Sequence, residues 1–254
     1  MTVRLSTKLR DLLVNSGGFN GALGQGCIRI YSGSQPASAD NAATGTLLGI
    51  VTSSSLALTM ESQASQTITV AGAAGSINTV TVGTFNIIAD GAVPFRTDAA
   101  TTAADLCAAI NRNGYYTATV SGAVVTIRPR AGAGATHNGY VVATTVTTLT
   151  ATSGGNMAGG VNPVNGLTFD APASGVLSKN PRQVWSFNGI AAGTAGWARF
   201  CGSAGDDGTT TSNLLPRLDG SVATSGGDFS LSNIVIAIGA PSTCDSFTWT
   251  QPAS

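Results

Sequence analysis

The only adjacent carboxylates of the chain, Asp206 and Asp207, stand directly before Gly208 in the segment SAGDDGTTTSN. Carboxylate oxygens on a glycine-containing loop can ligate Ca²⁺, although this segment lacks the alternating Asp/Asn spacing and the terminal glutamate of a helix–loop–helix calcium site. Asp206 and Asp207 are therefore the candidate metal ligands, and a solvated turn is the favoured alternative. We expect Asp40 and Asp219 to shape turns through their own side chains.

Groups that move protons are scarce. The 254 residues include one histidine, His137, and one glutamate, Glu61. Enzymes build most proton transfer and metal binding from such residues, and a nucleophilic serine also needs a base and an orienting acid. The sequence contains no Gly-x-Ser-x-Gly elbow, phosphate-binding loop or dinucleotide-binding glycine pattern. We therefore expect a protein that is not an enzyme, with no catalytic residue and no cofactor.

The cysteines show no metal-binding or redox spacing. The chain has four of them, at positions 27, 107, 201 and 244, and no Cys-x-x-Cys occurs. Buried thiols in strands are the favoured interpretation. A zinc site made from all four cysteines and a Cys201–Cys244 bridge formed in an oxidising medium remain open.

The tryptophans are candidates for ligand binding. Trp185, Trp197 and Trp249 all lie in the C-terminal part of the chain, with phenylalanines nearby. Exposed on one face, at least two of them could stack on sugars. The favoured alternative is that they fill the core, because aromatic side chains bury large areas.

Two further sets of residues could form subunit contacts. Leu5, Leu9, Leu12 and Leu13 follow helical spacing in residues 3–14, where Ser6 or Thr7 caps the start and Gly17-Gly18 ends the helix. This amphipathic helix is either a lid over the protein's own core or a docking arm. The second set is made of scattered arginines expected to fix contacts between subunits through bidentate pairs: Arg29, Arg96, Arg128, Arg130 and Arg199.

Composition limits the partners. Charged residues make up 9% of the chain and the net charge is +0, whereas about a quarter of the residues in an ordinary soluble protein are charged. No basic stripe is visible, so we expect no nucleic acid partner. The longest aliphatic run, residues 234–238, is too short to cross a bilayer, and no secretion signal is visible, so we expect no membrane and synthesis in the cytoplasm. A neutral surface with few charges tends to associate, which favours a homo-oligomer.

The pattern of short Thr/Val/Ile strands and Gly/Ser/Asp turns predicts a mainly β protein. We expect an N-terminal helix or arm (1–21) and an outer, jelly-roll-like β-sandwich made of residues 22–60 and 163–254. A small α+β module, residues 61–162, is inserted into it and carries one clear helix, Thr102–Asn113, with the apolar stripe Ala103, Leu106, Cys107 and Ile110. Two consecutive domains are the competing division.

Four segments of the outer part resemble small virion structural proteins of tailed bacteriophages. They are RIYSGSQPASADNAATGTLLG (29–49), GTAGWARF (193–200), RLDGSVATSGGDFSLSN (217–233) and FTWTQP (247–252). In the inserted module, residues 101–140 resemble a helix-plus-strands unit of phage tail proteins, notably contractile sheath proteins.

The resemblance implies a virion protein that is synthesised in the cytoplasm of a host bacterium. It does not settle whether the place of this protein is the capsid surface, the neck or the tail. Our first hypothesis is an accessory protein of the head or neck, such as a capsid decoration or cement protein, whose partners are the major capsid protein or neck and tail proteins. The alternatives are a protein associated with the tail tube, sheath or baseplate, and a fibre-type receptor or glycan-binding module. The family offers no catalytic residues.

Overall fold

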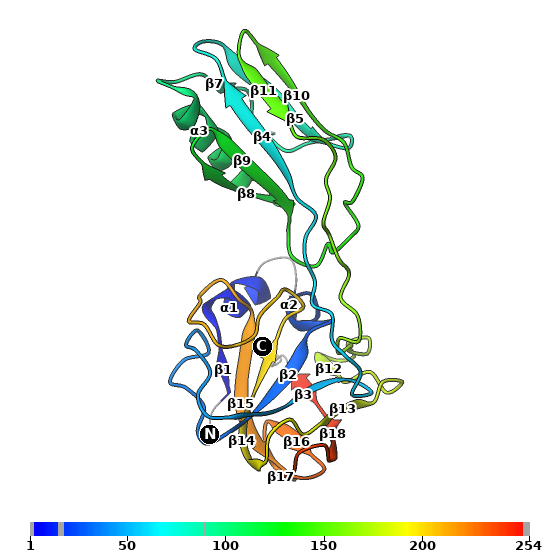
Figure 1. Ribbon diagram of the computed structural model, residues 1–254. Coiled ribbons are helices and arrows are strands. Elements are labelled where there is room, and N and C mark those ends of the chain that lie inside the picture. The colour runs from blue at the N-terminus through cyan, green and yellow to red at the C-terminus, as the bar shows by residue number, and fades with distance from the viewer. Residues whose placement is uncertain (1–2, 15–17, 89, 251–254) are drawn as a thin grey trace. The chain divides into compact units, whose positions relative to one another are not determined.

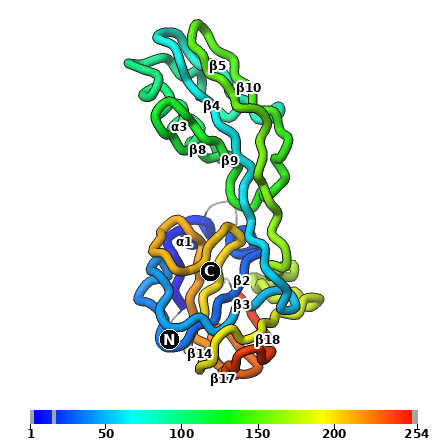
Figure 2. The backbone as a smooth tube through the Cα atoms, viewed as in Figure 1, coloured from blue at the N-terminus to red at the C-terminus, as the bar shows by residue number. Residues whose placement is uncertain are grey.

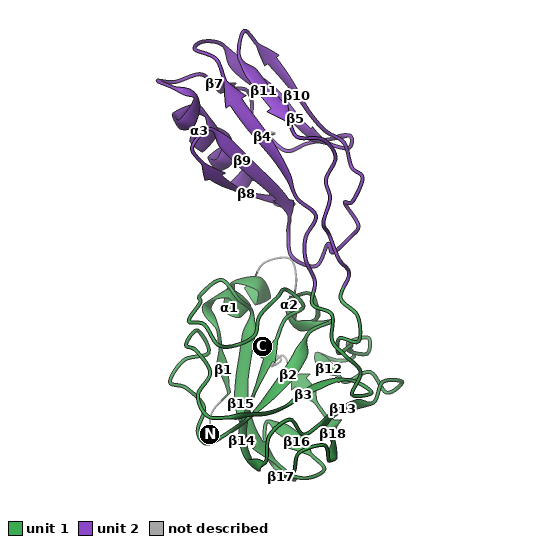
Figure 3. Cartoon of the chain, viewed as in Figure 1, with its two compact units in different colours: residues 1–60, 163–254 green, residues 61–162 purple. Residues whose placement is uncertain are grey.

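The computed structural model describes residues 3–14, 18–88 and 90–250. The chain forms two compact units, one made of residues 1–60 and 163–254 and the other of residues 61–162 (Figure 3). The sequence-based division of the outer part and the inserted module has its boundaries at the same two points. Figure 2 shows that unit 1 is built from the two ends of the chain and unit 2 from its middle.

Unit 1 begins with a short strand and two short helices, followed by strands from both parts of the chain (Figure 1). Its elements are β1 (Arg4–Leu5), α1 (Thr7–Val14), α2 (Gly18–Leu23), β2 (Cys27–Ser32), β3 (Leu47–Ser53), β12 (Val176–Ser178), β13 (Trp185–Asn188), β14 (Gly193–Cys201), β15 (Arg217–Ala223), β16 (Phe229–Leu231), β17 (Val235–Ile236), β18 (Pro241–Ser246) and β19 (Thr248–Thr250).

Seven of these strands form a closed barrel, in the order β2-β3-β13-β18-β16-β15-β14 and back to β2. The barrel closes because the nine-residue strand β14 pairs antiparallel with β2 on one side and with β15 on the other. All neighbours are antiparallel except β15 and β16. The mainly β prediction is confirmed, but the jelly-roll-like sandwich is wrong for unit 1, because its sheet closes on itself and most strand edges are paired.

One face of each barrel strand supplies the core. Ile28 and Ile30 of β2, Phe200 of β14 and Leu218 of β15 are buried in one apolar cluster. Aromatic side chains also pack together in it, for example Trp185, which lies 6.0 Å from Phe200 between ring centres. At Gly49 of β3 an added Cβ would lie 2.0 Å from the ring of Phe187, so only glycine fits there.

Unit 2 has two sheets and one helix. Its elements are β4 (Gln66–Ala71), β5 (Ser76–Val82), β6 (Phe85–Asn86), β7 (Val93–Pro94), α3 (Ala99–Asn111), β8 (Tyr116–Ser121), β9 (Val124–Pro129), β10 (Val142–Thr147) and β11 (Thr150–Ser153). One sheet has the order β11-β4-β9-β8, and the other has the order β10-β5-β6 with β7 also paired to β5. The Val and Ile side chains of both sheets share one core with α3.

Helix α3 starts three residues before the predicted position. Asp98 is its N-cap, because its carboxylate accepts a hydrogen bond of 2.7 Å from the Thr101 amide. Thr102, which the sequence suggested as the capping residue, is buried and donates its hydroxyl to the Asp98 carbonyl oxygen. The predicted apolar stripe of Ala103, Leu106, Cys107 and Ile110 is buried, as expected.

Candidate functional site

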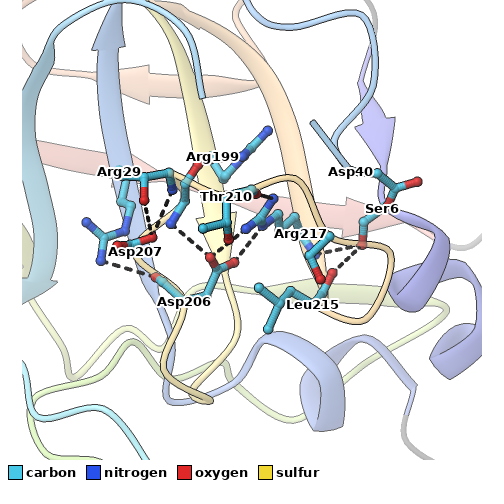
Figure 4. Close-up of polar contacts among 12 residues, drawn as sticks. Ser6, Arg29, Asp40, Arg199, Asp206, Asp207, Thr210, Leu215 and Arg217 are labelled. Atoms are coloured by element: carbon cyan, nitrogen blue, oxygen red, sulfur yellow. Dashed lines mark hydrogen bonds and ion pairs between the residues drawn. The ribbon is translucent and has the colours of Figure 1, made fainter. Parts of the chain in front are cut away.

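The densest group of charged side chains in unit 1 lies on the outer face of three adjacent barrel strands. Strand residues alternate between the two faces of a sheet, so Arg29 of β2, Arg199 of β14, and Arg217 and Asp219 of β15 point away from the core residues that flank them. Residues 203–215 cover this face and add Asp206 (Figure 4). We call these five residues the arginine cluster.

Two bidentate ion pairs form the centre of the arginine cluster. Arg199 donates from Nε and Nη2 to the two carboxylate oxygens of Asp219, each at 2.8 Å. Arg217 donates from Nε and Nη2 to the two oxygens of Asp206, each at 2.7 Å. All four side chains are at most 1% exposed. Paired hydrogen bonds of this geometry are the strongest that side chains make.

The covering loop folds around the guanidinium groups. The Gly208 amide donates to Asp206 Oδ1 at 2.8 Å, and the Gly208 carbonyl oxygen accepts from Arg199 Nη1 at 3.2 Å. Gly208 has a φ of 76°, a conformation that glycine adopts without a steric penalty. Arg217 Nη1 donates to the carbonyl oxygen of Thr210 at 2.9 Å (Figure 4). The ion pairs therefore hold the loop against the barrel.

Arg29 is the cation of the arginine cluster without a carboxylate partner among the described residues. Its Nη2 donates to the backbone oxygen of Asp206 at 3.2 Å, while its Nε is buried and makes no hydrogen bond. The cluster thus contains three guanidinium groups and two carboxylates.

Burial shifts the pKa values of this region. Burial opposes ionisation of Asp206, yet hydrogen bonds from Arg217 and the Gly208 amide hold its pKa below the usual value. Burial raises the pKa of Asp219 although Arg199 donates two hydrogen bonds to it. Burial also raises the pKa of the neighbouring Cys27 thiol to about 11 and that of Cys201 well above its usual value. Both thiols are therefore protonated at neutral pH and poor nucleophiles.

The metal prediction for Asp206 and Asp207 is not supported. The Asp206 carboxylate is buried and occupied by Arg217, so it is neither a solvated turn nor an open ligand. Asp207 is exposed and accepts from the amide and the hydroxyl of Thr209. Within residues 3–14, 18–88 and 90–250, no three His, Cys, Asp or Glu side chains come together in a group that could hold a metal ion.

The predicted turn roles of Asp40 and Asp219 need correction. Asp219 lies within β15, opposite Arg199, so its side chain forms an ion pair and not a turn. Asp40 accepts from the amide and the hydroxyl of Thr7 at the start of α1. Ser6 Oγ accepts from the Leu9 amide and so caps α1, as the sequence indicated.

The tryptophans do not form a stacking surface. Trp185 and Trp197 are fully buried, so the prediction that they bind a ligand is wrong, and the core-filling alternative holds. Trp197 stacks on Tyr31 at 4.6 Å between ring centres, and the Arg199 guanidinium lies 5.5 Å from its ring. Trp249 is half-buried and stacks on Phe19 of α2 at 4.7 Å.

The N-terminal leucines pack on the protein's own core. Leu9 is fully buried, and Leu5, Leu12 and Leu13 are partly buried against the same apolar cluster. Leu5 belongs to β1 and not to the helix. The lid interpretation therefore accounts for these side chains, and the docking-arm alternative stays a prediction. The predicted end of this helix at Gly17 lies outside the described residues.

Glu61 and His137 have structural environments in unit 2. The Glu61 carboxylate is buried and accepts from the amides of Gly132 and Gly134 at 2.7 to 3.0 Å, so it holds residues 132–134 against the start of the unit. His137 lies between the rings of Tyr116 and Tyr140, 5.5 and 5.0 Å away. Within the described residues, both aromatic rings that contact His137 belong to tyrosines.

The cysteines are free thiols. Cys27, Cys107, Cys201 and Cys244 are all buried and unpaired in disulfides, so neither a Cys201–Cys244 bridge nor a shared zinc site is formed. Cys27 and Cys201 stand opposite each other in the β2–β14 ladder.

Sequence reasoning did not find the arginine cluster. Arg29 and Arg199 were expected to contact other subunits, but Arg199 pairs within the chain. The available signal was the placement of Arg199 between Trp197 and Cys201 on one face of a strand. A charged residue between apolar neighbours needs a partner if that face is covered.

Among the helices of the described residues, none is long and apolar enough to span a bilayer.

The arrangement in unit 1 is suited to holding a loop and a strand register in place, since its four ion-paired side chains are buried and satisfy one another. Comparison of the chain with protein-family models, with curated proteins and with solved structures gives no match.

Proposed function

We propose that this chain is a non-enzymatic structural protein of a tailed bacteriophage virion, an accessory of the head or neck of the capsid decoration type. One observation carries the proposal. Three segments that resemble virion proteins, residues 29–49, 193–200 and 217–233, contain β2, β14 and β15, which are hydrogen-bonded neighbours in the barrel. Segments far apart in sequence therefore build one continuous surface and its arginine cluster. The fourth segment carries β19, and its residues 251–252 lie outside the described residues.

An exposed apolar patch gives this proposal a contact surface. Ile190, Val235 and Ile238 are 54%, 63% and 72% exposed. Val235 belongs to β17. The loops that carry Ile190 and Ile238 are joined by backbone hydrogen bonds, from the Gly239 amide to the Gly189 carbonyl oxygen at 2.7 Å and from the Gly189 amide to the Ala240 carbonyl oxygen at 3.0 Å. Exposed apolar residues that lie together mark interaction surfaces on soluble proteins. We call these three residues the apolar tip.

The mechanism is mechanical. Many identical copies bridge neighbouring subunits, and the sum of modest contacts is large because each bound copy raises the effective concentration of the next contact. The apolar tip replaces the N-terminal leucines as the proposed subunit contact, since those leucines are used inside unit 1. Partners of this class are the major capsid protein, neck or tail proteins, and further copies of the chain.

A place in the tail is the second candidate. Residues 101–140, which resemble a unit of sheath proteins, form most of α3 and the β8–β9 hairpin, with α3 packed on β8. A tail tube, sheath or baseplate protein would use unit 2 for its contacts.

Copy number in purified virions tests the proposal. Quantitative mass spectrometry that finds hundreds of copies, scaling with the major capsid protein, supports decoration of the head. About a dozen copies or fewer would contradict decoration and favour the neck, baseplate or fibres, and absence from particles would overturn the virion proposal altogether.

A matched pair of variants tests the apolar tip. Val235→Asp should reduce the number of copies retained on particles, because it places a charge in the contact. Leu214→Asp, at a residue that is 74% exposed in another loop, should leave retention unchanged. Equal retention of both variants would contradict this contact.

A further inference from the structure

Unit 2 carries a cleft that the proposed function does not use. It has a volume of about 260 Å³ and lies between β6, the end of α3 and the segment that leads into β8. Its lining combines apolar, aromatic and charged side chains: Phe85, Ile87, Asp90, Ala109, Arg112 and Tyr115, with Asn113 and Gly114 between the last two. The volume is slightly below the range of about 300–1,000 Å³ for drug-sized ligands, so it fits a single ring.

Two exposed aromatic rings form the walls of the cleft. Tyr115 is 70% exposed and Phe85 is 43% exposed. Their ring centres are 5.5 Å apart and their planes meet at 82°, so each presents a face or an edge to the cleft. An aromatic face offers dispersion contact and a negative quadrupole to polarised C–H groups. The buried side chain of Ile87 contributes to the apolar part of the lining.

The segment that carries Tyr115 is held in place by hydrogen bonds between side chains and the backbone. The Tyr115 amide donates to Asn113 Oδ1 at 2.7 Å, and Arg130 Nη2 donates to the Asn113 carbonyl oxygen at 3.0 Å. The Asn113 side-chain amide donates to the Ile87 carbonyl oxygen at 3.4 Å. Because the loop is already ordered, a ligand would lose little free energy to ordering it.

The polar side of the cleft presents a donor next to an acceptor. Arg112 Nε donates to Asp90 Oδ2 at 2.6 Å, and both side chains are 59% exposed. Within the described residues the other Asp90 oxygen and the terminal nitrogens of Arg112 have no hydrogen-bond partner in the protein. Adjacent hydroxyl groups of one ligand can accept from the guanidinium and donate to the carboxylate.

We propose that this cleft binds a pyranose ring of an uncharged glycan. The C–H face of such a ring fits the Tyr115 and Phe85 walls, and vicinal hydroxyls fit the Arg112–Asp90 pair. Asp90 disfavours a phosphate or another anion, and a wholly apolar ligand would remove water from the ion pair without replacing its hydrogen bonds. The inference does not depend on a place in a virion, and it assigns glycan binding to residues other than the tryptophans.

Binding of simple glycosides to the full chain tests the proposal. We would titrate ¹⁵N-labelled protein with the methyl glycosides of glucose, galactose, mannose, rhamnose and N-acetylglucosamine. At least one should shift the backbone signals of Arg112, Gly114 and Tyr115, with a Kd near the millimolar range. Tyr115→Ala should weaken this Kd about tenfold, the order expected for one aromatic contact. The side chain is mostly exposed, so the variant should fold normally.

Controls separate this site from general stickiness. Tyr140→Ala removes another exposed aromatic residue of unit 2 that does not line the cleft, and it should leave the Kd unchanged. Asp90→Asn should weaken binding of the glycosides. Benzyl alcohol, an apolar aromatic probe, should shift the backbone signals no more than the glycosides do. The proposal is overturned if none of the five glycosides shifts these signals, if Tyr140→Ala weakens binding as much as Tyr115→Ala, or if benzyl alcohol alone occupies the cleft.

Discussion

The variant Asp206→Asn should destabilise unit 1 strongly, while Asp207→Asn, one residue further, should not. In Asp206→Asn an NH2 group replaces one carboxylate oxygen that accepts hydrogen bonds from Arg217 or from the Gly208 amide. Two N–H donors then face each other without an acceptor between them. Arg217, whose side chain is 0% exposed, then keeps a buried charge without a counter-charge. Asp207 is exposed, and asparagine can still accept from Thr209.

The expected magnitudes differ several-fold. Removing one partner of a buried ion pair costs about 3–5 kcal/mol of unfolding free energy. For a domain of this size that corresponds to a fall in Tm of about 6–20 °C, at about 2–4 °C per kcal/mol. A surface substitution such as Asp207→Asn changes the free energy by about 0.5 kcal/mol or less.

Urea unfolding followed by tryptophan fluorescence measures this difference. All three tryptophans belong to unit 1, so the signal reports on that unit. The double variant Arg217→Met/Asp206→Asn removes both charges and should be less destabilised than the sum of the two single variants. The reasoning is refuted if Asp206→Asn loses less than about 1 kcal/mol, or if Asp207→Asn loses as much.

Three further predictions follow from pKa shifts and buried contacts. Because the pKa of Asp206 is lower in the folded protein than the unfolded value of 3.8, its stabilising contribution is complete above pH 3.8 and is lost as the pH falls through its folded pKa. The stability gap between the wild type and Asp206→Asn should therefore narrow in urea titrations below pH 3.8, and a constant gap would contradict this shift. The thiols of Cys27 and Cys201 should not react with a disulfide reagent at pH 8 until urea is added, because burial raises their pKa values. Fast labelling of the native protein would show that residues 203–215 do not cover these thiols. Glu61→Gln should speed hydrogen exchange of the Gly132 and Gly134 amides and cost about 1–3 kcal/mol, measured by circular dichroism of unfolding, whereas unchanged exchange would exclude an anchoring role for this carboxylate.

Local sequence patterns predicted the elements of this fold better than their assembly. Residues 27–32 alternate as a strand, and the apolar stripe of 103–110 marks a helix face, because both patterns depend on neighbours close in sequence. Barrel closure depends on β14 pairing with β2 and β15 at once, and the whole of unit 2 lies between β2 and β14 in the sequence. The jelly-roll expectation failed because short alternating strands fit a sandwich and a barrel equally well.

The arginine cluster was missed for a related reason. Arg199 and Asp219 are 20 residues apart, and only strand register brings them face to face. Aspartate before glycine is also the common signature of a turn, which led to the wrong assignment of Asp219. The aromatic cleft of unit 2 depends on β6 and the end of α3 lying together, and no sequence spacing specifies this.

The buried ion pairs explain how a chain with so few charges specifies its register. Strands β14 and β15 contain glycine and small residues, so hydrophobic alternation alone constrains their pairing loosely. A slip of one residue would turn Arg199 toward the barrel core and place Asp219 opposite Ala198 or Phe200, which leaves two buried charges without partners. The energetic penalty of unpaired charges is much larger than that of a misplaced alanine or glycine. We infer that the main effect of Arg199 and Asp219 is to destabilise pairings of β14 and β15 in a shifted register. A variant that replaces both with apolar residues should keep much of its stability but show exchange broadening of the β14 and β15 amide signals. Sharp, single signals for such a variant would show that packing alone fixes the register.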